Sequence, residues 1–208
     1  MDKNQEIIER LRKEYGDTES ALHYQNPYEL LVATILAAQC TDVRVNIVTK
    51  DLFKKYPSPK ELAQADLAEV EGYIKTCGLY KNKAKNLIAC AQRIMSEYGG
   101  VVPHTEEELT TLAGVGRKTA NVVLAFAFGL PAFPVDTHVK RVSNRIGFAH
   151  SDDPNKVEEE DKKIIRKEDW SQAHHWLIWH GRRVCKAQKP LCGTCCIEDL
   201  CPYPNKNL

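Results

Sequence analysis

The sequence predicts an all-α protein. Apolar residues follow helical spacing in almost every segment, and no stretch alternates apolar and polar residues as a half-buried strand would. Glycine and proline separate these segments, as they commonly do between helices. With 208 residues and 43% hydrophobic content, the chain is long enough to bury the core of one large or two small domains.

The composition excludes several classes of protein. The 29 basic and 28 acidic residues nearly cancel, so any nucleic-acid surface must come from local clustering of charge. The charged N-terminal segment resembles neither a signal peptide nor a transit peptide, and the longest uncharged run, 119–135, is too short and too broken to span a bilayer. We therefore expect no membrane contact and a cytoplasmic location, nucleoid-associated if the source is bacterial.

The N-terminal part of the chain is expected to form a series of helices. The first ends at Gly16 and has one apolar face, made of Ile7, Ile8, Leu11 and Tyr15. A short helix is expected from about Ser20. The run 28–39 is apolar all round, which indicates a helix enclosed by others, and Thr41 or Asp42 can cap the helix after it.

Short helices are then expected at 60–64 and, capped by Asp66, at 67–74. The segment 75–93 contains no acidic residue but carries Lys75, Lys81, Lys83, Lys85 and Arg93. A solvated helix face is the ordinary explanation of such a cluster. Leu79 within it favours a second explanation, because several proteins part stacked bases with an apolar wedge flanked by cations.

The C-terminal two thirds continue in helices. We expect them at 82–98, from a Thr105 to Glu108 capping box to Leu112, at 119–128, at 136–145, within 151–169, and from a Ser171 cap to Cys185. The segment 151–169 is rich in both signs of charge. Its residues Asp161, Lys162 and Lys163 are typical of a solvent-facing helix surface, and we assign them no chemistry.

A glycine hairpin, Gly114-Val115-Gly116, precedes the helix that carries Lys118. Glycines join helices in many proteins, so the hairpin alone is weak evidence of function. However, glycine lets the backbone approach a ligand closely, and the N-H groups at the start of a helix bind phosphate. Lys118 lies in the first turn, where the helix dipole disfavours a cation by roughly 0.3 to 1 kcal/mol. Such a violation of local electrostatics is typical of functional sites.

Asp136 has two possible roles. It can cap the helix that starts at Thr137, which is a purely structural role. A carboxylate near an amine nucleophile can also accept its proton and stabilise positive charge on a sugar ring as the base leaves. The two roles are compatible.

Four cysteines near the C-terminus, Cys185, Cys192, Cys195 and Cys201, follow the pattern Cys-x6-Cys-x2-Cys-x5-Cys. Four thiolates in one short loop can hold zinc or a [4Fe-4S] cluster. Only one short Cys-x2-Cys knuckle is present, whereas structural zinc sites usually have two, and this favours iron and sulfur. The spacing does not exclude Cys196 in place of Cys195.

Several motifs together resemble endonuclease III, a DNA glycosylase family of the helix-hairpin-helix superfamily with a [4Fe-4S] cluster. They are ILAAQCTD, CGLYKNKA, LAGVGRKTANVVL, VDTHVKR and the cysteine tail, and they cover nearly the whole chain. The resemblance implies a helix-hairpin-helix DNA glycosylase fold of two helical lobes with a DNA-binding cleft between them. One lobe would be the continuous segment 22–132, and the other 1–21 with 133–208, including the cluster loop 185–201.

The resemblance also implies the activity and the residues that perform it. The enzyme would act in base excision repair as a monomer on double-stranded DNA with a damaged base or an abasic site. It would remove oxidised pyrimidines and cleave the abasic site by β-elimination through a Schiff base on Lys118, with Asp136 as the catalytic carboxylate. Gln39 and Leu79 would enter the duplex, and Gly114, Val115, Gly116 and Lys189 would contact DNA. By the same resemblance, the cluster ligands are Cys185, Cys192, Cys195 and Cys201.

Two alternatives and two departures accompany this resemblance. A related adenine mismatch glycosylase shares the hairpin, the aspartate and the cluster, but Lys118 and the chain end at Leu208 argue against it. A non-catalytic DNA-binding module with a structural zinc is compatible with the hairpin and the thiols. Cys40 and Cys77 stand where non-thiol residues are expected, beside Gln39 and Leu79.

Overall fold

The computed structural model describes residues 2–208 and confirms the all-α prediction, because these residues form helices and no strand. The first six helices are α1 Lys3–Tyr15, α2 Pro27–Ala37, α3 Asp42–Lys55, α4 Pro59–Ala63, α5 Leu67–Ile74 and α6 Tyr80–Glu97. They are followed by α7 Glu106–Leu109, α8 Arg117–Ala127, α9 Thr137–Ile146, α10 Pro154–Ile164 and α11 Trp170–Arg183. Short 3-10 helices occupy Lys167–Asp169, Cys192–Thr194 and Glu198–Leu200. None of the helices within residues 2–208 is both long and apolar enough to cross a membrane.

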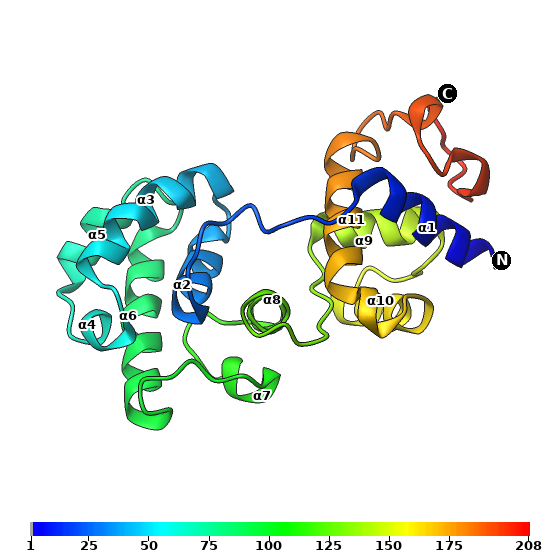
Figure 1. Ribbon diagram of the computed structural model, residues 1–208. Coiled ribbons are helices and arrows are strands. Elements are labelled where there is room, and N and C mark those ends of the chain that lie inside the picture. Colours follow the sequence, from blue (N-terminus) through cyan, green and yellow to red (C-terminus); the bar gives the residue numbers. More distant parts are fainter. Residues whose placement is uncertain (1) are drawn as a thin grey trace. The chain divides into compact units, whose positions relative to one another are not determined.

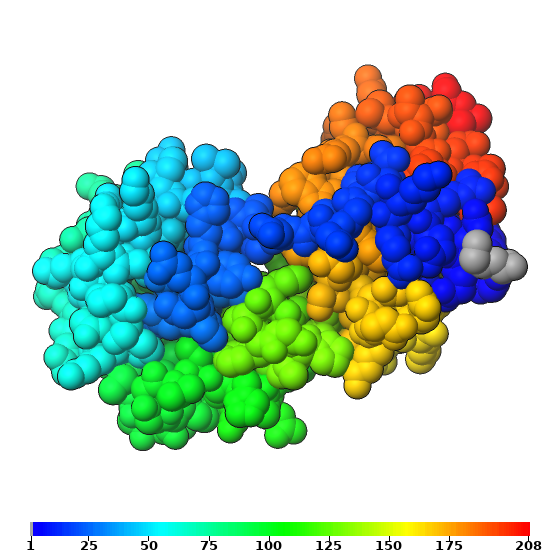
Figure 2. All heavy atoms as spheres, viewed as in Figure 1, coloured from blue at the N-terminus to red at the C-terminus, as the bar shows by residue number. Residues whose placement is uncertain are grey.

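The helices form two compact units (Figure 1). One is the continuous segment Ser20–Leu130, and the other combines the residues up to Glu19 with Pro131–Leu208. In the split unit, α1 packs against α11, so the blue N-terminal residues in Figure 2 lie beside the yellow, orange and red C-terminal ones. It stays a prediction that two separate lobes bind DNA, one made of 22–132 and the other of 1–21 with 133–208.

The continuous unit is organised around α2, whose side chains are buried from Leu30 to Leu36. This helix contacts α3, α6 and α8, as its uniformly apolar sequence predicts. Asn26 caps it by accepting a hydrogen bond from the Glu29 N-H. Therefore α2 is a fixed support for the turn that follows it, which carries Gln39.

The segment between Gly16 and Asn26 is not helical, so the helix expected from Ser20 is wrong. Its backbone bonds to a side chain of α3 instead: the Asn46 Oδ1 accepts from the His23 N-H at 2.9 Å, and the Asn46 Nδ2 donates to the Ala21 carbonyl at 2.9 Å. The hydrogen bonds to Asn46 therefore replace those that the His23 N-H and the Ala21 carbonyl would have made within a helix.

Several predicted caps are confirmed. The side chains of Thr41, Asp66 and Thr105 accept hydrogen bonds from backbone N-H groups in the first turns of α3, α5 and α7, respectively. Of the two candidates for α3, Thr41 is the cap. The Ser171 cap is wrong, because α11 starts at Trp170, directly after a 3-10 turn.

The split unit has its own core, to which α1, α9, α10, α11 and the cysteine loop all contribute. Its largest fully buried side chain is Phe133, in the non-helical segment that leads into α9. Trp176 and Val139 from α11 and α9 pack in the same core. The loop between residues 185 and 201 is attached through Ile197, which is fully buried there.

Asp161 on α10 is buried, so the expectation that it faces solvent is wrong. Its side chain is 0% exposed, and its Oδ2 accepts a hydrogen bond from the Ser143 hydroxyl at 2.7 Å. Its Oδ1 has no hydrogen-bond partner. Burial, with a smaller contribution from Glu160, raises the pKa of the Asp161 carboxyl to about 7. Below about pH 7 the folded protein therefore favours the neutral carboxyl.

This burial predicts an unusual dependence of stability on pH. Between about pH 4 and pH 7 the unfolded chain ionises Asp161 while the folded protein keeps the proton, so the free energy of unfolding falls as pH rises. The Asp161→Asn variant should lose this fall and be more stable than the wild type at pH 8 by a few kcal/mol, at about 1.4 kcal/mol per unit of pKa difference. Urea unfolding at pH 5 and pH 8 measures it, with the exposed Asp152→Asn as a control. The same pH slope in Asp161→Asn and wild type would contradict the prediction.

Candidate active site and DNA-contact residues

The glycine hairpin connects α7 to α8 within the continuous unit. Gly114 has φ +77°, a left-handed conformation that favours glycine, and a Cβ at this position would lie 3.1 Å from the Asn86 Cβ of α6. The Val115 side chain is buried, at 7% exposure, and its N-H donates to the Leu112 carbonyl at 3.1 Å. The hairpin thus lies against α6 at Gly114, while Gly114 and Gly116 themselves remain exposed.

The N-terminus of α8 is open. Gly116, the N-cap residue, has no side chain to cap the helix, and a Cβ there would meet nothing within 4 Å. The N-H groups of the first turn are therefore available to an anionic ligand such as a phosphate. Lys118 lies in this first turn with an exposed side chain, so its amine is accessible beside the same end of the helix.

Asp136 belongs to the split unit and caps α9. Its Oδ1 accepts a hydrogen bond from the Val139 N-H at 2.8 Å, which confirms the predicted capping role. The segment before it is held by α11, because the His174 Nδ1 lies 2.8 Å from the Pro134 carbonyl oxygen. Nothing in the sequence pattern indicated that His174 supports the residues leading to Asp136. The half-buried carboxylate is thus fixed in position at the start of a helix.

Gln39, Leu79 and Lys189 share an unusual backbone. They are the non-glycine residues with positive φ in the part of the chain that the structure describes, with values of 54°, 59° and 48°. This conformation costs an L-residue roughly 1 to 2 kcal/mol. All three side chains are exposed, Leu79 at 56%, so burial does not offset that cost. Such strain at exposed residues favours a role in ligand binding.

The Gln39 and Leu79 turns lie next to each other. A Cβ on Gly78 would be 3.0 Å from the Gln39 carbonyl oxygen, so the backbones of the two turns are in contact. Lys83, at the start of α6, donates hydrogen bonds from its Nζ to the Leu36 carbonyl at 2.9 Å and to the Ala38 carbonyl at 2.5 Å. Because the side chain of Lys83 is 4% exposed, it is a structural link and not part of the predicted cationic patch.

The exposed cations of the predicted patch are therefore Lys75, Lys81 and Lys85. Arg93, the other member of the predicted patch, is half-buried and donates from Nη1 to the Thr111 carbonyl at 2.8 Å, which connects α6 to the residues before the hairpin. The patch is thus smaller than the sequence indicates. Its three lysines still flank an exposed apolar residue.

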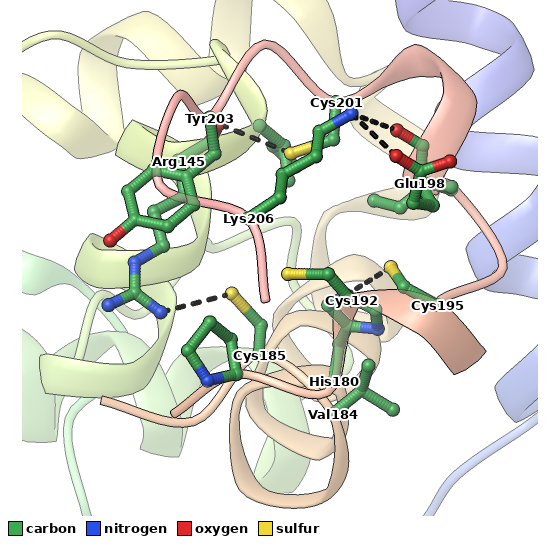
Figure 3. A pocket seen from close by; sticks show the side chains of 13 residues that line it. Arg145, His180, Val184, Cys185, Cys192, Cys195, Glu198, Cys201, Tyr203 and Lys206 are labelled. Atoms are coloured by element: carbon green, nitrogen blue, oxygen red, sulfur yellow. Dashed lines mark hydrogen bonds and ion pairs between the residues drawn. The ribbon is translucent and has the colours of Figure 1, made fainter. Parts of the chain in front are cut away.

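The four predicted ligand thiols line one pocket in the split unit, and Figure 3 shows their sulfurs around it. These residues are Cys185, Cys192, Cys195 and Cys201. Cys196 lines a different depression, with Glu14 and Arg10 of α1. Within residues 2–208, no three cysteine, histidine or acidic side chains lie close enough together to hold one metal ion.

The surroundings of the pocket suit thiolates that bind a cationic group. Burial raises the pKa of the Cys195 thiol to about 11, so its ionisation needs a compensating positive charge. The His180 Nε2 lies 3.5 Å from the Cys195 Sγ, and burial lowers the pKa of His180 to about 4, which keeps the ring neutral. The Arg145 Nη1 donates to the Cys185 Sγ at 3.5 Å.

Arginines of α9 attach the loop that starts at Cys185. Arg145 donates to the Lys186 carbonyl at 2.7 Å and to the Ala187 carbonyl at 3.0 Å, and its guanidinium lies 4.6 Å from the centre of the Tyr203 ring. Arg141 donates to the Cys185 carbonyl at 3.1 Å. The helix that Asp136 caps therefore also positions the loop that carries the four thiols and Lys189.

Comparison with known proteins agrees with this arrangement. Residues 32–167 match the family model described as HhH-GPD superfamily base excision DNA repair protein. The chain is 50% identical to endonuclease III of Synechocystis sp. over 95% of its own length and 90% of that protein, and 45% identical to endonuclease III of Escherichia coli K12 over 98% and 97%. The chain belongs to the endonuclease III family.

Solved structures of the endonuclease III family also match over nearly the whole chain. A trapped endonuclease III-DNA covalent intermediate superposes with a TM-score of 0.91 at 47% identity, covering 97% of this chain and 96% of that one. A non-covalent endonuclease III-DNA complex has the same values. As a member of this family, the chain is a base excision repair enzyme, a DNA glycosylase that also cleaves abasic sites.

Proposed function

We propose that this enzyme removes oxidised pyrimidines from double-stranded DNA and cleaves the resulting abasic site by β-elimination through a Schiff base on Lys118. The observation that carries the proposal is the exposed Lys118 amine in the first turn of α8, at an open helix N-terminus that follows a glycine hairpin. A phosphate bound there would hold the DNA backbone beside a nucleophile. The trapped covalent endonuclease III-DNA intermediate, which is similar to this chain, supports the same chemistry.

The proposed reaction proceeds in two stages. The Lys118 amine attacks C1′ of the flipped nucleotide, and the bond from C1′ to the base breaks with the electron pair leaving on the base. The amine then loses its proton, the sugar ring opens, and a Schiff base forms between Nζ and C1′. Removal of a C2′ proton allows the C3′-O bond to break, which releases the 3′ phosphate. The Asp136 carboxylate accepts a proton and stabilises the positive charge that develops on the sugar.

We assign the DNA contacts to the residues with open backbone or strained conformation. Gly114 and Gly116 would bind phosphate through their backbone N-H groups, and the buried Val115 between them would fix the turn, because its N-H donates to the Leu112 carbonyl at 3.1 Å. These contacts would position DNA without reading its sequence. Gln39 and Leu79, both exposed with positive φ, would fill the space left by the extruded nucleotide, and Lys189 would contact the backbone. We further propose that the enzyme acts as a monomer in the cytoplasm.

We assign the thiol pocket to a [4Fe-4S] cluster held by Cys185, Cys192, Cys195 and Cys201. Four soft sulfur donors surround a space, and Cys196 does not line it, which supports Cys195 as the ligand. Bound there, the cluster would supply a covalent cross-link of the loop that carries Lys189. Iron and sulfide analysis of the purified protein, with broad visible absorption, tests the assignment. One zinc per chain without iron would contradict it.

Borohydride trapping tests the catalytic proposal directly. Duplexes with an oxidised pyrimidine, an abasic site or no lesion are incubated with the enzyme and sodium borohydride, and the products are separated by denaturing electrophoresis. We expect a covalent protein-DNA adduct with the first two duplexes and none with the third. Base release and strand cleavage without any trapped adduct would exclude the Schiff base mechanism. A panel of lesions in the same assay defines the range of bases removed.

The strained backbone of Leu79 gives a further prediction. Leu79→Gly should have about the same free energy of unfolding as the wild type, because relief of the strain at φ +59° offsets the loss of a side chain that is 56% exposed and therefore partly buried. Loss of the wedge should slow incision at least about tenfold, because unstacking costs a few kcal/mol per step. The matched control Leu79→Ala removes the wedge but keeps the strain, so it should slow incision equally and be less stable than Leu79→Gly by about 1 kcal/mol. Thermal unfolding and single-turnover incision measure both effects; faster or unchanged incision in either variant would argue against the wedge.

A further inference from the structure

Two thiols lie where the Gln39 turn meets the Leu79 turn. Cys40 directly follows Gln39, and Cys77 directly precedes Gly78 and Leu79. The backbones of Gly78 and Gln39 are in contact, since a Cβ on the glycine would lie 3.0 Å from the Gln39 carbonyl oxygen. The two cysteines therefore flank this contact, one on each turn, and Cys40 lies near enough to Cys77 to help raise the pKa of its thiol.

The two thiols differ in their access to solvent. Cys77 is buried at 2% exposure, whereas Cys40 is partly exposed. Burial, followed by the contact with Cys40, raises the pKa of Cys77 to about 11, while Lys83 and Arg44 place positive charge beside it. A dissolved thiol reagent would therefore react first with Cys40, and Cys77 would react second, from within the protein.

We propose that Cys40 and Cys77 form a redox-modifiable dithiol that closes into a disulfide and thereby locks the Gln39 turn to the Leu79 turn. The existence of the disulfide does not depend on the proposed function. Its effect on DNA incision does, because that effect rests on the wedge role of Gln39 and Leu79.

The reaction needs an oxidant, for which a small-molecule disulfide such as glutathione disulfide is sufficient. The Cys40 thiolate attacks one sulfur, the glutathione S-S bond breaks, and one glutathione leaves as a thiolate that takes up a proton. The Cys77 thiol then loses its proton and attacks the Cys40 sulfur, which releases the second glutathione. Two protein thiols lose two electrons and two protons, and the small disulfide becomes two thiols.

The cross-link would act on two strained turns at once. Gln39 and Leu79 have φ of 54° and 59°, and each is within two residues of one of the cysteines. The buried Lys83 already holds the Gln39 turn through the Leu36 and Ala38 carbonyls. A disulfide would remove the remaining freedom of the turns to adjust to an opened duplex. Because small displacements of reacting groups are costly, we expect incision about tenfold slower in the oxidised enzyme.

Thiol mapping tests the disulfide in the full-length, cluster-loaded protein. The enzyme is equilibrated in glutathione buffers of graded oxidation, free thiols are alkylated, and peptides are analysed by mass spectrometry. We expect Cys40 and Cys77 to lose alkylation together and to yield one cross-linked peptide pair lighter by two hydrogens. A Cys40-glutathione adduct that persists while Cys77 stays alkylated would overturn the proposal. The variant Cys90→Ala, which removes a different buried thiol, on α6, should still form the cross-link.

Incision assays on the same samples test the lock. Oxidised wild type should be about tenfold slower and should recover on reduction with dithiothreitol, whereas Cys77→Ala and Cys40→Ala should not respond to the buffer. Equal rates for oxidised and reduced wild type, with the cross-link present, would overturn the locking effect. A reduced wild type that incises no lesion would instead mean that the proposed function fails, because the cross-linked peptide is detected without DNA.

Discussion

Lys118→Ala is expected to give no covalent adduct with borohydride and to slow strand cleavage at an abasic site by at least about a thousandfold, because the variant lacks the nucleophile. The side chain is exposed, so the fold should be unaffected. Removing a cation from the first turn of α8 should if anything raise the free energy of unfolding slightly. Denaturing electrophoresis and thermal unfolding measure the two effects.

The control for Lys118→Ala is Lys50→Ala, which removes an exposed lysine from α3 in the same unit. It should trap and cleave like the wild type. Binding of Lys118→Ala to an abasic duplex, measured by fluorescence anisotropy, should stay within about tenfold of wild type if the hairpin provides the phosphate contact. An adduct of undiminished yield in Lys118→Ala would mean that another amine is the nucleophile.

Local hydrogen bonds explain which parts of the fold could be predicted from the sequence. Asp136, Asp66 and Thr105 cap their helices as expected, because a cap joins residues only a few positions apart. The buried helix α2 could be predicted for a similar reason, since Thr34 is the only polar residue between Leu30 and Ala37. Family membership was equally accessible, because several motifs occur in order along one chain.

Contacts between distant residues explain what could not be predicted. Asp161 has the sequence environment of a solvent-facing residue, but α10 packs against α9, where Ser143 donates to its buried carboxyl. Lys83 belongs to a run of cations but bonds to carbonyls at the end of α2. Positive φ at Gln39 and Leu79 leaves no mark in the sequence, because neither residue type favours that conformation.

The pairing of Cys40 with Cys77 has the same origin. In the sequence each cysteine is a single departure beside a motif, and nothing relates one to the other. Only the contact between the Gln39 and Leu79 turns brings them together. A disulfide between residues on two separate turns can therefore be inferred only once the positions of both turns are known.

Asp136→Asn separates the capping role of this residue from its chemical role. Asparagine caps a helix about as well as aspartate, so the bond to the Val139 N-H and the stability of α9 should be kept. The negative charge is lost, so glycosylase and lyase rates should fall about a hundredfold to ten-thousandfold. Asp136→Ala should show the same loss of rate and, in addition, a free energy of unfolding lower by about 1 kcal/mol, because the cap is lost too. Single-turnover rates and urea unfolding of the three proteins measure this pattern. If Asp136→Asn retained full activity, the carboxylate would be a cap alone, and the positive charge on the sugar would have to be stabilised by another group.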